Sequence, residues 1–371
     1  MDKRLAAGLA WLATIGWLAP LQAQDTTAVS PRVFSVGLSG QYGFIFAHTQ
    51  DVENTRGARP WGVQATFVWQ RTDAQAWNTC ACYPRQGLLL GYYNYDSPVL
   101  GHSAKAAYFL EPTFRLTPRL SGLVRGTGGL AYLTNPYHPV RNPLNQSYSL
   151  PVSIYIAFGL GLNYQLTPRY RLNAQAVYEH ISNGGMKEPN KGINYPMMSL
   201  GLEYALNPVA IPKRSRTTSQ AVGPHSSWQW EAYGFASSRT PGFGQQRRYF
   251  IGGAGVLVRK RVGRIHAFNA GLEGYGDFAS QERMRQDSIA GLSHWRVGLL
   301  AGHDFVLGRF LFSQQLGVYV FNEIPYFGRV YHRWGLTYAL DDRWAVGFNL
   351  KAHRHVANFI ELRLVRKLGQ R

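Results

Sequence analysis

The chain has 371 residues, of which 45% are hydrophobic and 14% aromatic, and it contains 40 glycines. Its 39 lysines and arginines outnumber 20 aspartates and glutamates, which gives a formal net charge of +19. Beyond residue 23 no continuous apolar stretch is long enough for a membrane-spanning helix, which excludes such a helix from that part of the chain. Many aromatic residues and glycines with weak hydropathy are instead typical of a β-barrel, whose strands turn only alternate residues to lipid.

The N-terminus has the pattern of a secretory signal peptide. A charged start is followed by an apolar run at residues 5–21 and by the small-residue site Gln-Ala-Gln. We expect cleavage after Ala23, so that residues 1–23 are removed. A membrane anchor is the alternative, although the run is short and Pro20 interrupts it. An exported chain with a barrel composition is expected in the outer membrane of a Gram-negative bacterium.

Strand-like segments follow one another along the first half of the chain. The clearest, residues 152–166, has an apolar row on its even positions and small or polar residues on its odd positions. This alternation predicts an antiparallel barrel strand with one face to lipid and one to the lumen. The strands predicted in this half cover residues 33–48, 60–71, 85–95, 104–116, 119–134, 151–166, 169–182 and 196–206.

The two cysteines, Cys80 and Cys82, lie between two predicted strands. A spacing of two residues is near the geometric limit for a disulfide, so the sequence leaves their pairing open. Two cysteines are also too few for a zinc site. We assign them no chemistry.

Residues 207–226 interrupt the strand pattern with prolines, basic residues and Ser/Thr, which predicts a linker. Two all-β architectures remain open. In the first, residues 24–206 form an eight-stranded outer-membrane barrel and residues 227–371 form a second β-rich, barrel-like unit. In the second, both halves form one wider barrel of about sixteen strands. The strands predicted in the second half cover residues 227–238, 247–260, 264–279, 290–305, 308–322, 328–340, 343–355 and 357–368.

A candidate base and nucleophile end the predicted strand at 169–182. Residues i and i+2 of an extended chain share a face, so His180 and Ser182 should be neighbours. The imidazole could then take the hydroxyl proton in acyl transfer. Both residues fall on the apolar, lipid-facing row, where polar groups are costly unless they are used. The alternative is a strand end whose polar residues lie at the membrane boundary.

The segment around this pair resembles the PagL-type lipid A 3-O-deacylases, also called acyloxyacyl hydrolases. The resemblance rests on His180-x-Ser182-Asn183, on Pro189-Asn190-x-Gly192, and on the upstream segments 126–137 and 142–147; it covers roughly residues 33–206. It implies an eight-stranded outer-membrane barrel that removes an ester-linked 3-hydroxyacyl chain from the 3-position of lipid A.

The resemblance also implies roles for individual residues. Ser182 would be the nucleophile and His180 its general base, while Asn183 and Asn190 would build the oxyanion site or position the loop. The family places a glutamate where this chain has Asn194, so Asn194 would orient the histidine without charge. Glu188 in the same loop is the alternative orienting residue.

The basic charge indicates either an anionic partner or lumen-facing and loop arginines that only contact water at the strand ends. Export argues against nucleic acid and favours lipopolysaccharide, whose phosphates Lys187 and Lys191 could attract. The proposed ester hydrolysis requires no metal or cofactor, and a homodimer is compatible with the sequence. Two other functions remain open: a phospholipase that uses the same serine, and a non-catalytic barrel that acts as a pore or as a structural protein in contact with lipopolysaccharide.

Overall fold

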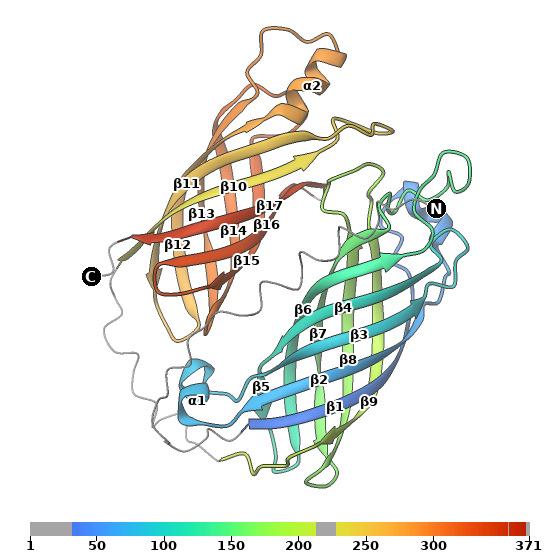
Figure 1. Cartoon of the computed structure of the whole chain (residues 1–371), viewed down its shortest axis with the longest axis vertical. Helices are drawn as coiled ribbons and strands as arrows, with labels where there is room; N and C mark the ends of the chain where they lie inside the picture. Colours follow the sequence, from blue (N-terminus) through green and yellow to red (C-terminus); the bar gives the residue numbers. More distant parts are fainter. Residues whose placement is uncertain (1–31, 213–227, 355, 369–371) are drawn as a thin grey trace, which may run out of the picture. The chain divides into compact units, whose positions relative to one another are not determined.

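A computed structural model describes residues 32–212, 228–354 and 356–368. It is an all-β protein made of two closed, eight-stranded antiparallel barrels (Figure 1). The predicted signal peptide, residues 1–23, and most of the predicted linker lie outside the described residues.

The first barrel closes through strands from the first half of the chain only. Neighbouring strands pair in chain order, β1 pairs with β9, and β4 pairs with β6 to close the ring. The wall strand predicted at 104–116 is divided into β4 and β5 at Pro112, which has no N–H to donate to a ladder. The strands are β1 (Arg32–Gly43), β2 (Trp61–Arg71), β3 (Arg85–Asn94), β4 (His102–Glu111), β5 (Thr113–Arg115), β6 (Leu120–Leu133), β7 (Val152–Gln165), β8 (Tyr170–Ser182) and β9 (Ile193–Ala205).

The second barrel closes by the pairing of its first and last strands, β10 and β17. The alternative of one barrel of about sixteen strands is therefore wrong, because the edges of each half pair with each other. The strands are β10 (Trp228–Arg239), β11 (Tyr249–Arg261), β12 (His266–Asp277), β13 (Trp295–Leu307), β14 (Phe310–Asn322), β15 (Val330–Ala339), β16 (Trp344–His353) and β17 (Val356–Leu368).

The sequence did not predict the short helices η1 (Gln50–Thr55), α1 (Ala74–Cys80) and α2 (Phe278–Gln286), which lie in connections between strands. Asp73 caps α1 by accepting the N–H of Ala76, and a disulfide joins Cys80, the last residue of the helix, to Cys82. In the described part of the chain, no helix has the length and apolar character needed to cross a membrane.

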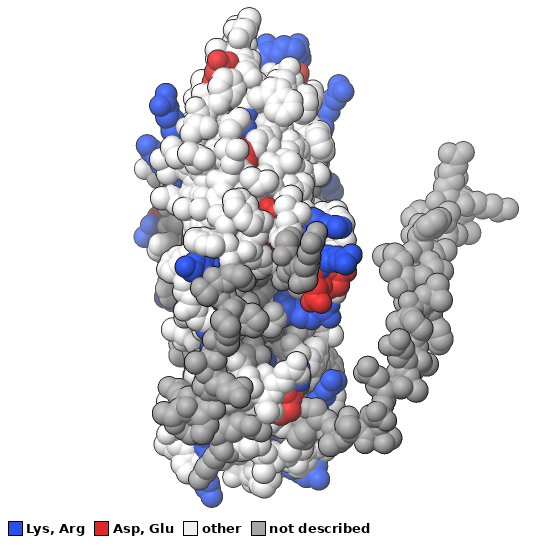
Figure 2. All heavy atoms as spheres, turned by 90° about the vertical axis from the view of Figure 1, so that its left-hand side faces the viewer, with Lys and Arg blue, Asp and Glu red and all other residues white. Residues whose placement is uncertain are grey.

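The wall of the first barrel alternates as the sequence predicts. In β7 the side chains of Ile156, Phe158 and Leu160 are exposed on the outside, whereas Ser153 and Asn163 are buried. On the face shown in Figure 2, uncharged side chains cover most of the described wall, and lysines and arginines stand in separate groups. This distribution is typical of strands that turn one face to lipid.

Oppositely charged side chains contact one another inside both barrels. In the first barrel Lys105 Nζ lies 2.6 Å from Glu179 Oε2, and both side chains are fully buried. In the second, Arg333 is buried between Glu273 and Glu361. Small barrels of this size have interiors filled by side chains. The buried ion pairs therefore form a packed polar core rather than a wide open channel.

The two ends of the first barrel differ in their connections. One end carries the segments 44–60, 95–101, 134–151 and 183–192. The other end carries the tight turns 116–119 and 166–169, together with segment 72–84, which contains α1. Transmembrane barrels have short turns on the periplasmic side and longer loops outside the cell. Because β8 runs into 183–192, the predicted site lies at the end with long loops.

Candidate functional site

The end of β8 brings His180 and Ser182 into hydrogen-bond contact. Both residues continue the outward row of the strand, in which Tyr178 is exposed. His180 Nε2 lies 2.9 Å from Ser182 Oγ, the distance expected between a base and the hydroxyl it activates. Ser182 is only 9% exposed. The spacing predicted from the extended chain is therefore present in the structure.

Asn194 supplies the second contact of the imidazole. It stands directly opposite His180 in the β8–β9 pair, and its Oδ1 lies 2.7 Å from His180 Nδ1. A carbonyl oxygen here accepts the Nδ1–H, which leaves the Nε2 lone pair for the serine hydroxyl. Glu188 is exposed, and no contact joins it to His180 among the described residues.

Asn183 and Asn190 hold the loop that follows the serine. The side chain of Asn183 is buried, donates from Nδ2 to the Lys187 carbonyl at 2.6 Å, and accepts the N–H of Met186 at 3.0 Å. Asn190 Oδ1 accepts the backbone N–H of Asn183 at 2.9 Å. The two asparagines therefore differ in their contacts. Asn183 is saturated by loop contacts, whereas no described residue accepts from the amide nitrogen of Asn190, which is free to donate to a ligand.

Gly192 lies against the edge of the imidazole. Its φ of +80° is in the left-handed region that favours glycine. A Cβ at this position would lie 2.7 Å from His180 Cε1. Its N–H donates to the Ser147 carbonyl at 2.8 Å, which fixes this close approach.

The loop at 134–151 supports the site through residues whose roles the sequence did not predict. Asn145 Oδ1 accepts the N–H of Ser147 at 3.0 Å and so shapes the turn that receives Gly192. Tyr148 Oη donates to the Leu100 carbonyl at 2.7 Å, and burial raises the pKa of this phenol. The asparagine-rich run at 142–147 was the available signal, but its contacts join segments that are distant in sequence.

The two predicted phosphate-binding lysines differ in their surroundings. Lys191 Nζ lies 2.9 Å from Asp51 Oδ2, so its charge is already paired. No carboxylate pairs with Lys187 among the residues that the structure describes. Lys187 is therefore the better candidate for an anionic group of a ligand. The described residues also contain no group of three or more His, Cys, Asp or Glu side chains that could hold a metal ion.

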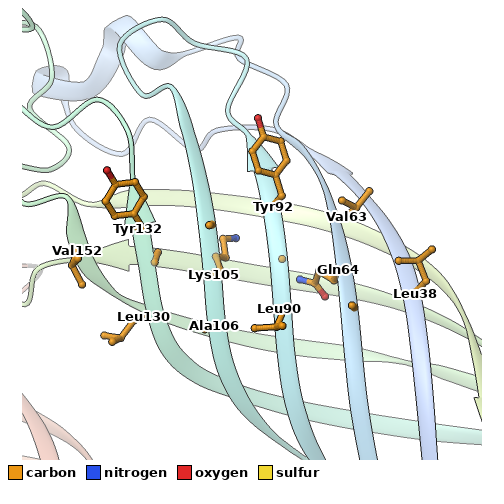
Figure 3. A pocket seen from close by; sticks show the side chains of 14 residues that line it. Leu38, Val63, Gln64, Leu90, Tyr92, Lys105, Ala106, Leu130, Tyr132 and Val152 are labelled. Atoms are coloured by element: carbon orange, nitrogen blue, oxygen red, sulfur yellow. The ribbon is translucent and has the colours of Figure 1, made fainter. Parts of the chain in front are cut away.

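A shallow hollow of about 620 Å³ lies elsewhere on the first barrel (Figure 3). Apolar and small side chains such as Leu90, Ala106 and Leu130 line it on the outward wall. None of the candidate site residues is among those that line it. It is part of the apolar wall and does not belong to the hydrogen-bonded site.

The fold and the site define a transmembrane-type β-barrel with a serine, a histidine and an asparagine linked by hydrogen bonds on its outward face. The family model described as lipid A 3-O-deacylase (PagL) matches residues 60–203. A second model, described as the C-terminal domain of acyloxyacyl hydrolase (PagL_C), matches residues 228–369. The chain belongs to the PagL family of lipid A deacylases.

Solved barrels of other kinds resemble parts of the chain. The match to Neisserial surface protein A includes 46% of this chain and 96% of that protein, at 14% identity and a TM-score of 0.33. The match to the N-terminal barrel domain of Pseudomonas aeruginosa OprF includes 46% of this chain and 97% of that domain, at 18% identity and a TM-score of 0.28. No curated protein matches the chain.

Proposed function

We propose that this protein is an outer-membrane serine esterase that hydrolyses the ester-linked 3-hydroxyacyl chain at the 3-position of lipid A. The observation that carries the proposal is the chain of hydrogen bonds Ser182–His180–Asn194, which joins the outward row of β8 to β9. This segment lies within the region matched by the lipid A 3-O-deacylase model. Residues 1–23 would direct export, and the part at 24–206 would be the catalytic barrel.

The proposed reaction is acyl transfer in two steps. Ser182 Oγ attacks the acyl carbonyl carbon while its proton moves to His180 Nε2. The tetrahedral intermediate collapses, the bond to the sugar oxygen breaks, and His180 returns the proton to that oxygen. Water then attacks the acyl-serine with His180 again as the base, and the 3-hydroxy fatty acid is released. Asn194 keeps the imidazole in the required tautomer throughout.

Donors near Ser182 would stabilise the oxyanion. The amide nitrogen of Asn190 is fixed in direction because its oxygen is held by the Asn183 N–H. Gly184 and Gly185 both have positive φ and let the backbone come close to a ligand. Preorganised donors of this kind are a large part of catalysis in acyl transfer.

The position of the site fits a lipid substrate. An outward row at the long-loop end of a barrel meets the outer leaflet, where lipid A has its acyl chains beside its phosphates. Lys187 could contact a phosphate, because no carboxylate is paired with it among the described residues. The packed interior of the barrel, with its buried Lys105–Glu179 pair, argues against a pore.

The test is mass spectrometry of lipid A incubated with refolded protein. Wild type should remove one 3-hydroxyacyl chain, whereas Ser182→Ala and His180→Ala should each lose activity by roughly a thousandfold or more. Ser121→Ala, a serine of β6 at the short-turn end, is the matched control and should retain activity. Deacylation by folded Ser182→Ala would refute the assignment. Hydrolysis of phospholipid vesicles instead of lipid A would favour the phospholipase.

A further inference from the structure

His48 lies beside the hydrogen-bonded site, just before the region matched by the family model. The chain beyond β1 continues to pair with β9, since Phe46 N–H donates to the Asn194 carbonyl at 2.8 Å. Two residues later, His48 reaches the side chain of Asn194. Its Nδ1 lies 2.9 Å from Asn194 Nδ2. The contact therefore arises from backbone pairing that holds both residues in place.

The amide of Asn194 can serve His180 in only one orientation. Its oxygen must face His180 Nδ1, because the Nδ1–H needs an acceptor if Nε2 is to remain free as a base. The opposite orientation would place an NH2 group against that N–H. It would favour the tautomer with the proton on Nε2, which cannot deprotonate Ser182.

We propose that His48 is a positioning residue of the hydrolytic site, where it holds the Asn194 amide with its oxygen toward His180. The inference rests on the proposed function. In the proposed arrangement a neutral His48 has its proton on Nε2 and accepts the Asn194 NH2 at Nδ1, and with this tautomer the bond forms in only one of the two amide orientations. No other side chain accepts a hydrogen bond from Asn194 Nδ2 among the described residues. The relay is therefore Ser182, His180, Asn194 and His48.

A carboxylate at position 194 would not need such a partner, since both of its oxygens are acceptors. An asparagine does, because its two ends are chemically different. His48 thus compensates for the absence of a symmetrical acceptor in this chain. It acts through Asn194, so it should affect the rate of the chemical step and leave substrate binding unchanged.

The test compares His48→Ala with His48→Asn, whose Oδ1 occupies the position of Nδ1 and restores an acceptor. His48→Ala should lower kcat roughly tenfold with KM unchanged, since a lost hydrogen bond of about 1.4 kcal/mol corresponds to a factor of ten. His48→Asn should recover most of the rate. Gln50→Ala, at an exposed neighbour whose side chain makes no hydrogen bond or ion pair among the described residues, is the control and should match wild type.

A double-mutant cycle identifies the partner. In an Asn194→Ala background there is no amide to hold, so His48→Ala should cause no further loss of rate. Additive losses would overturn the proposal, as would a His48→Ala variant with the kcat of wild type. A fall in kcat that His48→Asn fails to rescue would also overturn it.

A second readout separates this inference from the proposed function. The rate at which a fluorophosphonate labels Ser182 reports the reactivity of the serine without any lipid substrate. If wild type labels rapidly but leaves lipid A intact, the proposed function fails. A tenfold slower labelling of His48→Ala, rescued in His48→Asn, would then still support the positioning role. Equal labelling of wild type and His48→Ala would refute it.

Discussion

His180 and Asn194 face each other across the β8–β9 pair, with Asn194 Oδ1 2.7 Å from His180 Nδ1. Their contact is a direct cross-strand pair, so the register of the barrel wall fixes it. The opposite, inward row carries Glu179 and Glu203, which pair with Lys105 and with Arg85 inside the barrel. Neither carboxylate of those two strands contacts the imidazole, and the neutral amide of Asn194 lies beside Nδ1 instead.

Replacing Asn194 should change the rate in either direction according to the new side chain. Asn194→Ala removes the acceptor and should lower kcat at least tenfold, the effect of one lost hydrogen bond. Asn194→Glu supplies a charged acceptor, whose hydrogen bonds are roughly twice as strong, and should raise kcat about tenfold. The kcat of both variants is measured by following lipid A deacylation with mass spectrometry. A slower Asn194→Glu enzyme with wild-type folding would show that the imidazolium gains nothing from charge here.

Gly192→Ala should impair the site through contact with the imidazole. The new Cβ would lie 2.7 Å from His180 Cε1, so the ring must move away from Ser182 or from Asn194. A displacement of a catalytic group by about 1 Å can lower kcat about a hundredfold. Gly57→Ala is the matched control, since Gly57 also has a positive φ, +89°, but open space around its Cβ position. Equal activities of the two variants would mean that only backbone strain matters.

The two loop lysines should contribute unequally to binding. Lys187→Ala removes a charge with no carboxylate partner among the described residues, and should raise KM for lipid A several-fold with little change in kcat. Lys191→Ala breaks an ion pair with Asp51 that is about half exposed, and such pairs stabilise proteins by less than about 1 kcal/mol. Initial rates over a range of lipid A concentrations compare them. With dephosphorylated lipid A the two variants should have the same KM. An equal rise in KM for both variants with intact lipid A would contradict the prediction.

Most of the fold could be predicted from the sequence because barrel strands carry their own signal. Every predicted strand corresponds to a wall strand, since the alternation of Val152–Gln165 and its neighbours reports which face is buried. The alternation could not decide between one barrel and two. That choice depends on which edges pair, and the pairing of β1 with β9 is a long-range contact. The helices in the connections were missed because they are short.

The site was predictable where its residues are local in sequence. His180 and Ser182 are two residues apart on a strand, so their contact follows from strand geometry. The placement of Asn194 came from the family resemblance and depends on the register of β8 and β9. His48 had no signal at all, because it reaches Asn194 across 146 positions of sequence through the pairing of β1 with β9.

The buried pair Lys105–Glu179 should stabilise the first barrel only as a pair. Lys105 Nζ also donates to Tyr195 Oη at 2.6 Å and lies 3.1 Å from the centre of the Tyr93 ring, so the charge is fully enclosed. Lys105→Met leaves the Glu179 carboxylate buried without its partner and should lower the free energy of unfolding by about 3–5 kcal/mol.

The double variant Lys105→Met/Glu179→Leu removes both charges and should recover most of that loss, because replacing a whole buried pair by apolar side chains is often neutral. Urea unfolding of the barrel in lipid vesicles, followed by tryptophan fluorescence, measures each variant. If the single and the double variant were equally destabilised, the loss would come from packing around Tyr93 and Tyr195 and not from the unpaired carboxylate. Glu179 directly precedes His180 in β8, so deacylation by the double variant would also show whether the catalytic geometry depends on this inner pair.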